Sequence, residues 1–503
     1  MALSVGAPTD PLLAAIEGSG LLGITTKQIA AATGLPVQEA TLRLDQLART
    51  GSVTRMGRGL WVLERFHSDP QKGPDFLGPR QYSERFERDF GISIGLREGP
   101  IQFSPNEERP VHRWWPYVQG FSAAFVEEVL GRYGMGSGTT VLDPFCGSGT
   151  VPVVARLQGA RGIGIDRMPI AAWVSRAKGC WEVDPSSLWA EALKVCEDRS
   201  PSRLAPPFLR ETPSHFAPAV LQGLLRLKEN LGRLEEGSVQ ELLRLSYASI
   251  LIPVSRLKRS PCLGYARGGS DAPPDPFARF LEAAARVRDD LRWVQAHRER
   301  WGPPLQIHDG GAAELSLPEG SVDLAVTSPP YVNGMDYVMN YKIDLAWMDL
   351  VSSYEDLRRL RSALVACDNV PRAETAGRKA SPTLQGEEWL QEIGDRIDLN
   401  LQGKRGYRRL DVRAIVEKYF DDLLGVIRNL RRSLRPGGRF VVVNGDSLLA
   451  GTYIPGDLLF ARLARSEGFR VEGLEIARSR RSGQRRDFLL RETVLTLQKP
   501  SRG

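Results

Sequence analysis

A short polar, proline and aromatic segment is the part of this sequence best suited to chemistry. Thr327-Ser328-Pro329-Pro330-Tyr331 follows an apolar run over residues 322–326 that predicts a buried parallel strand. Proline lacks an N–H group and fixes φ at about −65°, so the loop offers carbonyls without internal donors. One hydroxyl, these carbonyls and an aromatic face can accept hydrogen bonds from an amino group and stack on the ring that bears it. Alone, such a segment is most often a proline-rich turn, so other motifs have to support the chemical interpretation.

A glycine-bearing loop earlier in the chain has the pattern of a nucleoside-binding site. Residues 140–150 read as a strand that runs into Gly147 and Gly149, and residues 151–158 read as the helix that follows. Glycine allows a ligand to approach the backbone closely at a helix N-terminus. A second strand ends in Asp166, about 20 residues after the loop, where βαβ units place a ribose-binding carboxylate. A third strand ends in Asp309.

Together, residues 143–150 and Ser328–Tyr331 resemble the two signature motifs of the amino-group DNA methyltransferases, in the SPPY, non-permuted order. The resemblance implies methyl transfer from S-adenosylmethionine to an exocyclic amine of a flipped base in double-stranded DNA. It implies a catalytic loop made of Ser328, Pro329, Pro330 and Tyr331, and it places Asp166 on the ribose and Asp309 on the adenine amine. Residues 112–122 resemble the aromatic motif that flanks the cofactor loop. The implied cofactor-binding residues are Tyr117, Asp143, Phe145, Gly147, Gly149, Thr150, Asp166 and Asp309.

The loop chemistry distinguishes several kinds of methyl transfer. An aromatic amine is a poor nucleophile, and acceptors at Ser328 and the Pro329 carbonyl could hold its hydrogens so that its lone pair points at the methyl group. This requires no metal. Carbon-5 methylation needs a Pro-Cys loop after the fourth strand; Pro261-Cys262 lies elsewhere, and we expect Cys262 to be packed. By the same family resemblance, serine at the first loop position, in place of the Asp or Asn usual in adenine enzymes, favours cytosine N4, with adenine N6 and RNA as alternatives. A DNA-binding regulator without catalysis is an alternative of another class.

The element pattern predicts an α/β fold. We expect a Rossmann-like, mostly parallel, seven-stranded sheet with helical insertions. Residues 419–434 read as an amphipathic helix, 439–443 as a strand, and 469–477 with 488–498 as a closing β-hairpin. The predicted units are an N-terminal unit (1–66), a linker (67–110), the cofactor half of the core (111–178), a helical insertion (179–301), the catalytic-loop part (302–349), a charged insertion (350–413) and the C-terminal strands (414–503).

The N-terminal unit resembles a winged helix-turn-helix. Residues 26–33 and 37–49 read as two helices, and residues 51–55 and 59–63 alternate like two strands. In such a unit the second helix could enter a DNA groove. Glu39 and Asp45 on that helix weaken this role, and a protein-contact role is equally compatible.

Composition and charge set the broad class. The chain has 503 residues, a formal net charge of +7 and five scattered cysteines without a CxxC pair, which argues against disulfides and a zinc site and favours the cytoplasm. No apolar run predicts a membrane span. Two basic clusters are candidate DNA contacts: Arg405 and Arg408, and Arg480, Arg481, Arg485 and Arg486. Either insertion could read the target sequence. A restriction or defence-system partner is a further expectation.

Overall fold

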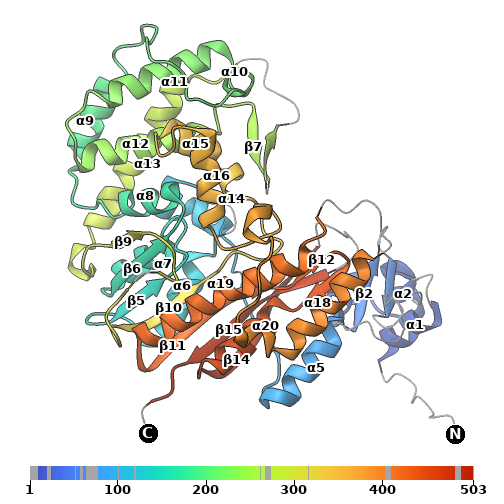
Figure 1. Ribbon diagram of the computed structural model, residues 1–503. Helices are drawn as coiled ribbons and strands as arrows, with labels where there is room; N and C mark the ends of the chain where they lie inside the picture. Colours follow the sequence, from blue (N-terminus) through green and yellow to red (C-terminus); the bar gives the residue numbers. More distant parts are fainter. Residues whose placement is uncertain are drawn as a thin grey trace, which may run out of the picture.

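The centre of the molecule is a mixed sheet of eight strands. In the computed structural model its order is β4-β14-β15-β11-β10-β5-β6-β9 (Figure 1). The structure describes residues 10–19, 24–50, 52–56, 60–63, 78–99, 101–117, 120–260, 262–266, 273–314, 316–402, 409–481 and 489–501.

The strands of the described residues have the following bounds: β1 Ile24–Thr25, β2 Val53–Met56, β3 Leu60–Leu63, β4 Gly95–Leu96, β5 Thr140–Asp143, β6 Arg161–Asp166, β7 Leu257–Arg259, β8 Leu263–Tyr265, β9 Gln306–Asp309, β10 Val322–Thr327, β11 Leu434–Gly445, β12 Ser447–Leu449, β13 Thr452–Ile454, β14 Arg470–Arg481 and β15 Leu489–Gln498. The α-helices are α1 Pro11–Ser19, α2 Thr26–Thr33, α3 Val37–Arg49, α5 Pro79–Phe90, α6 Ala123–Arg132, α7 Thr150–Leu157, α8 Pro169–Ala177, α9 Pro185–Val195, α10 Thr212–His215, α11 Pro218–Leu231, α12 Ser238–Ile250, α13 Pro276–Gln295, α14 Tyr337–Asn340, α15 Lys342–Trp347, α16 Tyr354–Ala363, α17 Pro382–Gln385, α18 Glu388–Leu401, α19 Val412–Ser433 and α20 Gly456–Ser466.

The predicted mostly parallel sheet is confirmed. Strands β9, β6, β5, β10 and β11 run parallel, and β15 is antiparallel to both β11 and β14. Alternate side chains of β10 face opposite layers: Leu324 and Val326 pack with α6 and α7, and Ala325 packs with α19 and α20. Since parallel strands end at one edge, the loops after β5 and β10 meet there.

The expected count of seven strands is wrong, because β4 forms an eighth. Its two residues pair in parallel with Glu475 and Ile476 of β14. A two-residue exposed strand carries no hydrophobic periodicity, so the sequence could not reveal it. The range 67–110, which we predicted to be a linker, also contains α5, whose Tyr82 and Phe86 are buried in the main core. Part of that range therefore belongs to the core.

The first insertion builds a separate helical layer. Helices α9, α11, α12 and α13 pack on one another and on α8, at the top of Figure 1. A two-stranded hairpin, β7 with β8, projects from this layer and joins no other sheet.

The N-terminal residues form a small unit at the right of Figure 1. Helices α1, α2 and α3 accompany a three-stranded sheet of order β1-β3-β2, with Leu12, Leu44 and Trp61 in its own core. The two helices and the two strands predicted for this unit are present, and its assignment as a winged helix stays a prediction. Across the described ranges of the chain, no helix is both long and apolar enough to span a membrane.

Candidate active site

The loop after β5 is held by hydrogen bonds from both neighbouring strands. The Asp143 carboxylate accepts from the Thr327 hydroxyl over 2.6 Å and from the Phe145 N–H over 3.0 Å. The end of β5 is therefore joined to the end of β10. Burial raises the pKa of Asp143 to about 7, against the opposing effect of these two donors.

Both glycines of this loop are required by its geometry. Gly147 and Gly149 have φ of 51° and 83°. A Cβ at Gly147 would lie 2.8 Å from the Tyr117 ring, and one at Gly149 would lie 2.9 Å from the Ser175 hydroxyl oxygen. A larger residue at either position would collide with its neighbour as well as strain the backbone.

Asp166, at the end of β6, connects to the same loop. Its carboxylate accepts from the Gly147 N–H over 2.8 Å and from the Met168 N–H over 2.9 Å. Burial raises the pKa of Asp166 to about 6, although these backbone donors oppose the shift. A carboxylate held this way can still accept hydrogen bonds from ligand hydroxyls through its remaining lone pairs.

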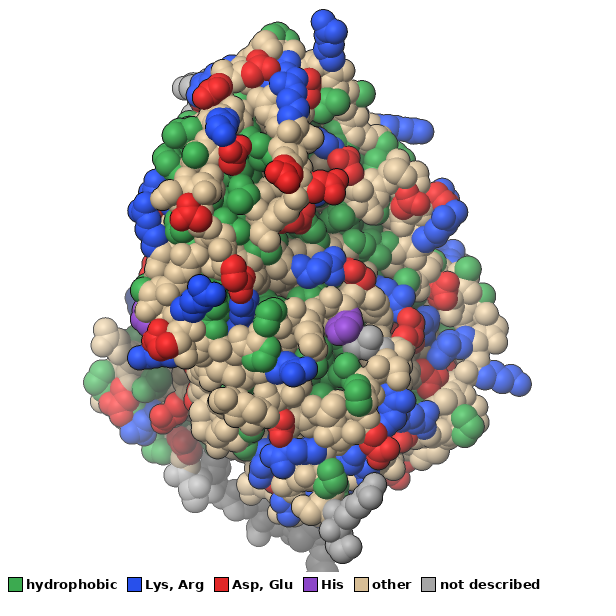
Figure 2. All heavy atoms as spheres, turned by 90° about the vertical axis from the view of Figure 1, so that its left-hand side faces the viewer, with side chains coloured by type: hydrophobic (Ala, Val, Ile, Leu, Met, Phe, Trp, Pro, Cys, Tyr) green, Lys and Arg blue, Asp and Glu red, His purple; other side chains and the backbone are tan. Residues whose placement is uncertain are grey.

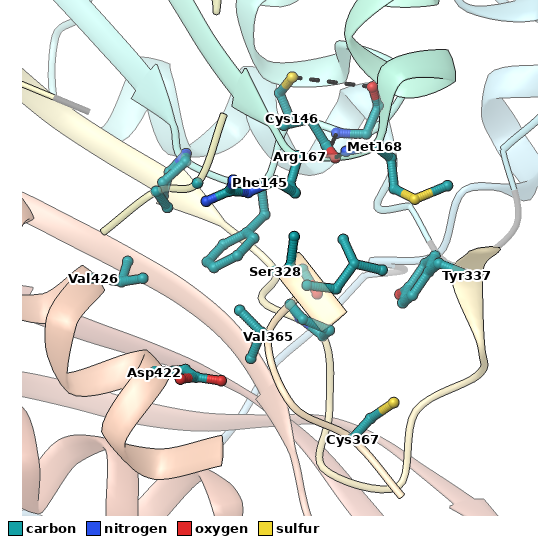
Figure 3. A pocket seen from close by; sticks show the side chains of 18 of the residues that line it. Phe145, Cys146, Arg167, Met168, Ser328, Tyr337, Val365, Cys367, Asp422 and Val426 are labelled. Carbon is teal, nitrogen blue, oxygen red and sulfur yellow. Dashed lines mark hydrogen bonds between the residues drawn. The ribbon is translucent and has the colours of Figure 1, made fainter. Parts of the chain in front are cut away.

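These loops surround a cavity of about 350 Å³ (Figure 3). Six of the eight predicted cofactor residues line it: Tyr117, Asp143, Phe145, Gly147, Thr150 and Asp166. Gly149 is absent from the lining because it packs on Ser175. Asp309 is also absent: it is exposed and both its oxygens accept from Arg176, at 2.8 and 3.3 Å.

The second insertion supplies a wall of this cavity that the sequence did not suggest. Residues 361–365 and Cys367 line it opposite Phe145. The Ala366 N–H donates to Asp422 over 2.9 Å, and Arg361 pairs with Asp336 over 2.9 Å. Backbone contacts between distant segments leave no motif in a single sequence, which explains why this wall was missed.

The loop after β10 separates this cavity from a larger one of about 950 Å³. Ser328 lines both cavities, Pro330 lines the smaller, and Pro329 and Tyr331 line the larger. Pro144, Phe145 and Cys146 border only the smaller cavity. The serine hydroxyl therefore lies on the wall shared by two ligand-sized spaces.

Tyr331 is fixed on three sides. Its hydroxyl donates to Glu492 over 2.6 Å, a Cβ at Gly445 would come within 3.0 Å of its ring, and the Arg480 guanidinium carbon lies 5.2 Å from its ring centroid. Glu492 also accepts from Arg478. The sequence analysis missed Glu492, because the closing strand carries other polar residues and its pairing with Tyr331 joins segments far apart in the sequence.

The predicted DNA-contacting arginines are only partly described. Arg480 donates to the Asp446 carbonyl and lines the larger cavity. Arg481 is the last residue of β14, and Arg405, Arg408, Arg485 and Arg486 lie outside the described residues. Cys262, which we expected to be packed, is exposed and lines the larger cavity, because it lies on the connection between β7 and β8.

Comparison with known proteins finds relatives among the methyltransferases. The chain is similar to Type II methyltransferases. It is 24% identical to M.BsoBI of Geobacillus stearothermophilus, over 80% of this chain and 88% of that one. It is 23% identical to M.AvaI of Anabaena variabilis, over 77% and 85%. No protein-family model matches.

Two further similarities are partial. Over 24% of this chain and 17% of the relative, the chain is 31% identical to ribosomal RNA large subunit methyltransferase K/L of Shewanella frigidimarina. A solved geranyl diphosphate methyltransferase aligns with a TM-score of 0.28 and 11% identity, over 84% of this chain and 95% of that one.

Proposed function

We propose that this protein is an S-adenosylmethionine-dependent DNA methyltransferase that modifies an exocyclic amino group, with cytosine N4 favoured. The observation that carries the proposal is the position of Ser328 on the wall common to the two cavities. Methyl transfer needs a donor and an acceptor on opposite sides of one reacting centre. The similarity to two Type II methyltransferases over most of the chain supports the same conclusion.

The smaller cavity suits S-adenosylmethionine, which supplies an activated methyl group on a sulfonium centre. The half-buried Asp166 carboxylate is placed to accept from ribose hydroxyls, and Phe145 and Met168 offer apolar contact to a purine ring. Gly147 brings the loop backbone to the cavity lining, where it can meet the amino-acid end of the ligand. We retain Asp309 as a candidate for the adenine amine, which would require its release from Arg176.

The larger cavity suits a base flipped out of a duplex. Tyr331 and Tyr337 border it and provide aromatic surface, and Ser328 with the Pro329 carbonyl could hold the two amine hydrogens. Holding them draws the nitrogen toward tetrahedral geometry, so its lone pair can attack the methyl carbon. The N–C bond forms as the C–S bond of the sulfonium breaks, S-adenosylhomocysteine leaves, and the methylated nitrogen gives up one proton to water. No covalent intermediate with the protein is needed, so these groups act by positioning and by electrostatics.

The donors of the larger cavity favour cytosine over adenine. Arg478 and Arg480 both line it. Cytosine presents a carbonyl oxygen beside the ring nitrogen next to its amine, whereas adenine has no carbonyl. A guanidinium can therefore satisfy an acceptor that only cytosine brings.

Labelled methyl transfer is the direct test. Purified protein is incubated with S-adenosylmethionine carrying a labelled methyl group and with duplex DNA or RNA, and the modified nucleoside is then identified. We expect N4-methylcytosine from DNA and at least a tenfold lower rate for Ser328→Ala, since one positioned hydrogen bond is worth about 1.4 kcal/mol or more in the transition state. Label in RNA alone, or in no nucleic acid, would refute the proposal.

Two accessory roles follow from this assignment. The N-terminal unit, if it is a winged helix, would contact either flanking DNA or a protein partner. A restriction or defence-system partner is the natural protein partner of a site-specific modification enzyme, and α3 offers exposed Val37 and Leu42 for such a contact.

A further inference from the structure

The β7–β8 hairpin is the feature of the helical layer that the cavities do not explain. It pairs three residues with three and joins no other sheet, and a hairpin that small has little stability by itself. Between Arg256 and Ala266 the sequence has three basic residues and no acidic one. Arg256 and Lys258 are exposed, and so is Tyr265, at 57% of its surface.

The position of the hairpin is specific. Its connection reaches the larger cavity, where Cys262 is a lining residue together with Ser328 and Pro329. Arg478 and Arg480 of β14 line the same cavity. In Figure 1 the β7 arrow leaves the helical layer and points down toward the C-terminal strands of the central sheet. Two basic hairpins, one from the middle of the chain and one from its C-terminal part, therefore border the space that contains the catalytic loop.

One face of β7, formed by Leu257 and Arg259, is firmly attached. Leu257 is buried in the core of the helical layer. Arg259 pairs with the buried Asp344, donates to the Asn340 carbonyl over 3.0 Å and lies 4.4 Å from the centroid of the Tyr341 ring. Tyr341 stacks on Tyr117 at 5.5 Å and 8°, and Tyr117 contacts Gly147 of the cofactor loop. These contacts hold Arg256, Lys258 and the connection with Cys262 at a fixed place relative to the loop after β10.

The charge of Arg256 and Lys258 is not neutralised by the described residues. No acidic side chain among them pairs with Lys258, and the Arg256 guanidinium donates to the Ser214 carbonyl, over 3.4 Å. By contrast, basic and acidic side chains are interspersed on the side of the molecule seen in Figure 2. An uncompensated basic element beside the catalytic cavity complements a polyanion that enters that cavity.

We propose that the β7–β8 hairpin is a contact element for duplex DNA, which assigns a target-contacting role to the first insertion. Arg256 and Lys258 contact phosphates next to the extruded nucleotide, and the connection with Cys262 lies against the neighbouring base pairs. This inference rests on the proposed function, because it takes the larger cavity as the site of the flipped base.

Cys262 provides a direct footprint. Its alkylation by a small maleimide is followed by mass spectrometry, with and without duplex DNA. With duplex at roughly ten times its Kd, about nine-tenths of the protein is bound, so we expect alkylation of Cys262 to slow by about tenfold. S-adenosylmethionine alone should not protect it, since Cys262 lines only the larger cavity. Unchanged alkylation on protein that demonstrably binds DNA would overturn the inference.

A charge-neutralising pair supplies a second, independent measurement. For Arg256→Gln with Lys258→Gln, we expect the slope of log Kd for duplex DNA against log salt to become less steep by about 2, at roughly 0.9 per phosphate contact. The matched control is Arg279→Gln with Arg292→Gln on α13, two exposed arginines that line neither cavity. Equal slopes in the two double variants would overturn the inference.

These measurements distinguish a failure of the proposed hairpin role from a failure of the proposed enzyme function. If wild-type protein methylates DNA while both hairpin results are negative, the hairpin role fails and the enzyme assignment stands. If wild-type protein neither binds nor methylates duplex DNA, the proposed function fails. Protection of Cys262 by single-stranded RNA and not by duplex DNA would overturn the choice of partner.

Discussion

The Tyr331 hydroxyl donates a hydrogen bond of 2.6 Å to the Glu492 carboxylate, across 161 positions of sequence. This bond joins the loop after β10 to the last strand of the sheet. Burial, followed by the negative charge of Glu492, holds the pKa of Tyr331 well above its ordinary value, so the hydroxyl keeps its proton and remains a donor. Glu492 in turn accepts from Arg478. The aromatic face offered to a base is therefore oriented by the closing hairpin.

Removing only this bond should slow the reaction without affecting the cofactor. Tyr331→Phe keeps the ring but leaves one oxygen of Glu492 without its donor, at a cost of about 1.5–3 kcal/mol for a charged partner. We expect a loss of roughly tenfold or more in the methyl-transfer rate and unchanged affinity for S-adenosylmethionine, measured by single-turnover kinetics and calorimetry. Tyr331→Ala should lose more, because the ring is removed as well. A Phe variant as active as wild type would show that ring orientation does not depend on Glu492.

Binding of the cofactor should depend on the ionisation of Asp166. Its pKa of about 6 in the folded protein lies above the ordinary value, so the carboxyl is protonated below pH 6 and then accepts hydrogen bonds poorly. Affinity for S-adenosylmethionine should rise with pH through 6 and differ by about tenfold between pH 5 and pH 7. Asp166→Asn should bind weakly and lose this dependence. The same dependence in the Asn variant would assign it to another group, such as Asp143.

The same shift has the opposite sign for stability. Because the folded protein holds the Asp166 proton up to about pH 6 and the unfolded chain releases it near pH 4, the contribution of this group to stability falls as pH rises between these values. Urea unfolding of the cofactor-free protein should show this decrease, and Asp166→Asn should reduce it.

The parts of the site that the sequence predicted are those built from local pattern. β5, β6 and β10 are short segments with apolar residues at their centres, and the polar residues that end them meet at one edge because parallel strands share their direction. Glu492 and the wall around Val365 were not predictable in this way. Their roles depend on pairings between segments far apart in sequence. Such pairings leave no local pattern that can be recognised in a single sequence. The start of α19, seven residues before the predicted 419, was missed for a simpler reason: helix boundaries are set by tertiary packing.

The position of Asp309 differs from the one that the family resemblance implies. Its side chain is 62% exposed and forms a bidentate pair with Arg176 outside the cavity lining. An exposed ion pair contributes at most about 1 kcal/mol. If Asp309 stays paired with Arg176, Asp309→Ala should change the affinity for S-adenosylmethionine by less than about fivefold, and Asp166→Ala should change it more. A loss at Asp309 as large as that at Asp166 would show that the carboxylate leaves Arg176 and holds the adenine amine.

The strongest single determinant of stability should be Arg491, which lies buried on β15 directly before Glu492. Its guanidinium contacts Asp446 at 3.3 Å and Asp457 at 3.1 Å, and donates to the Ser83 hydroxyl of α5 over 2.6 Å. Burial, then the charge of Asp457, raises the pKa of Asp446. Arg491 thus holds together two buried carboxyl groups and ties α5 to the sheet.

Arg491→Ala should lower the free energy of unfolding by about 3–5 kcal/mol, because it leaves two buried carboxyl groups without their cation. Arg470→Ala on β14 is the matched control: its side chain is 65% exposed and pairs with Glu472, so the loss should be below about 1 kcal/mol. Urea denaturation followed by circular dichroism measures both. Because Arg491 neighbours Glu492, the Ala variant should also lose methyl transfer before it unfolds, at denaturant concentrations where the control is fully active. Equal unfolding midpoints for the two variants would contradict this role of Arg491.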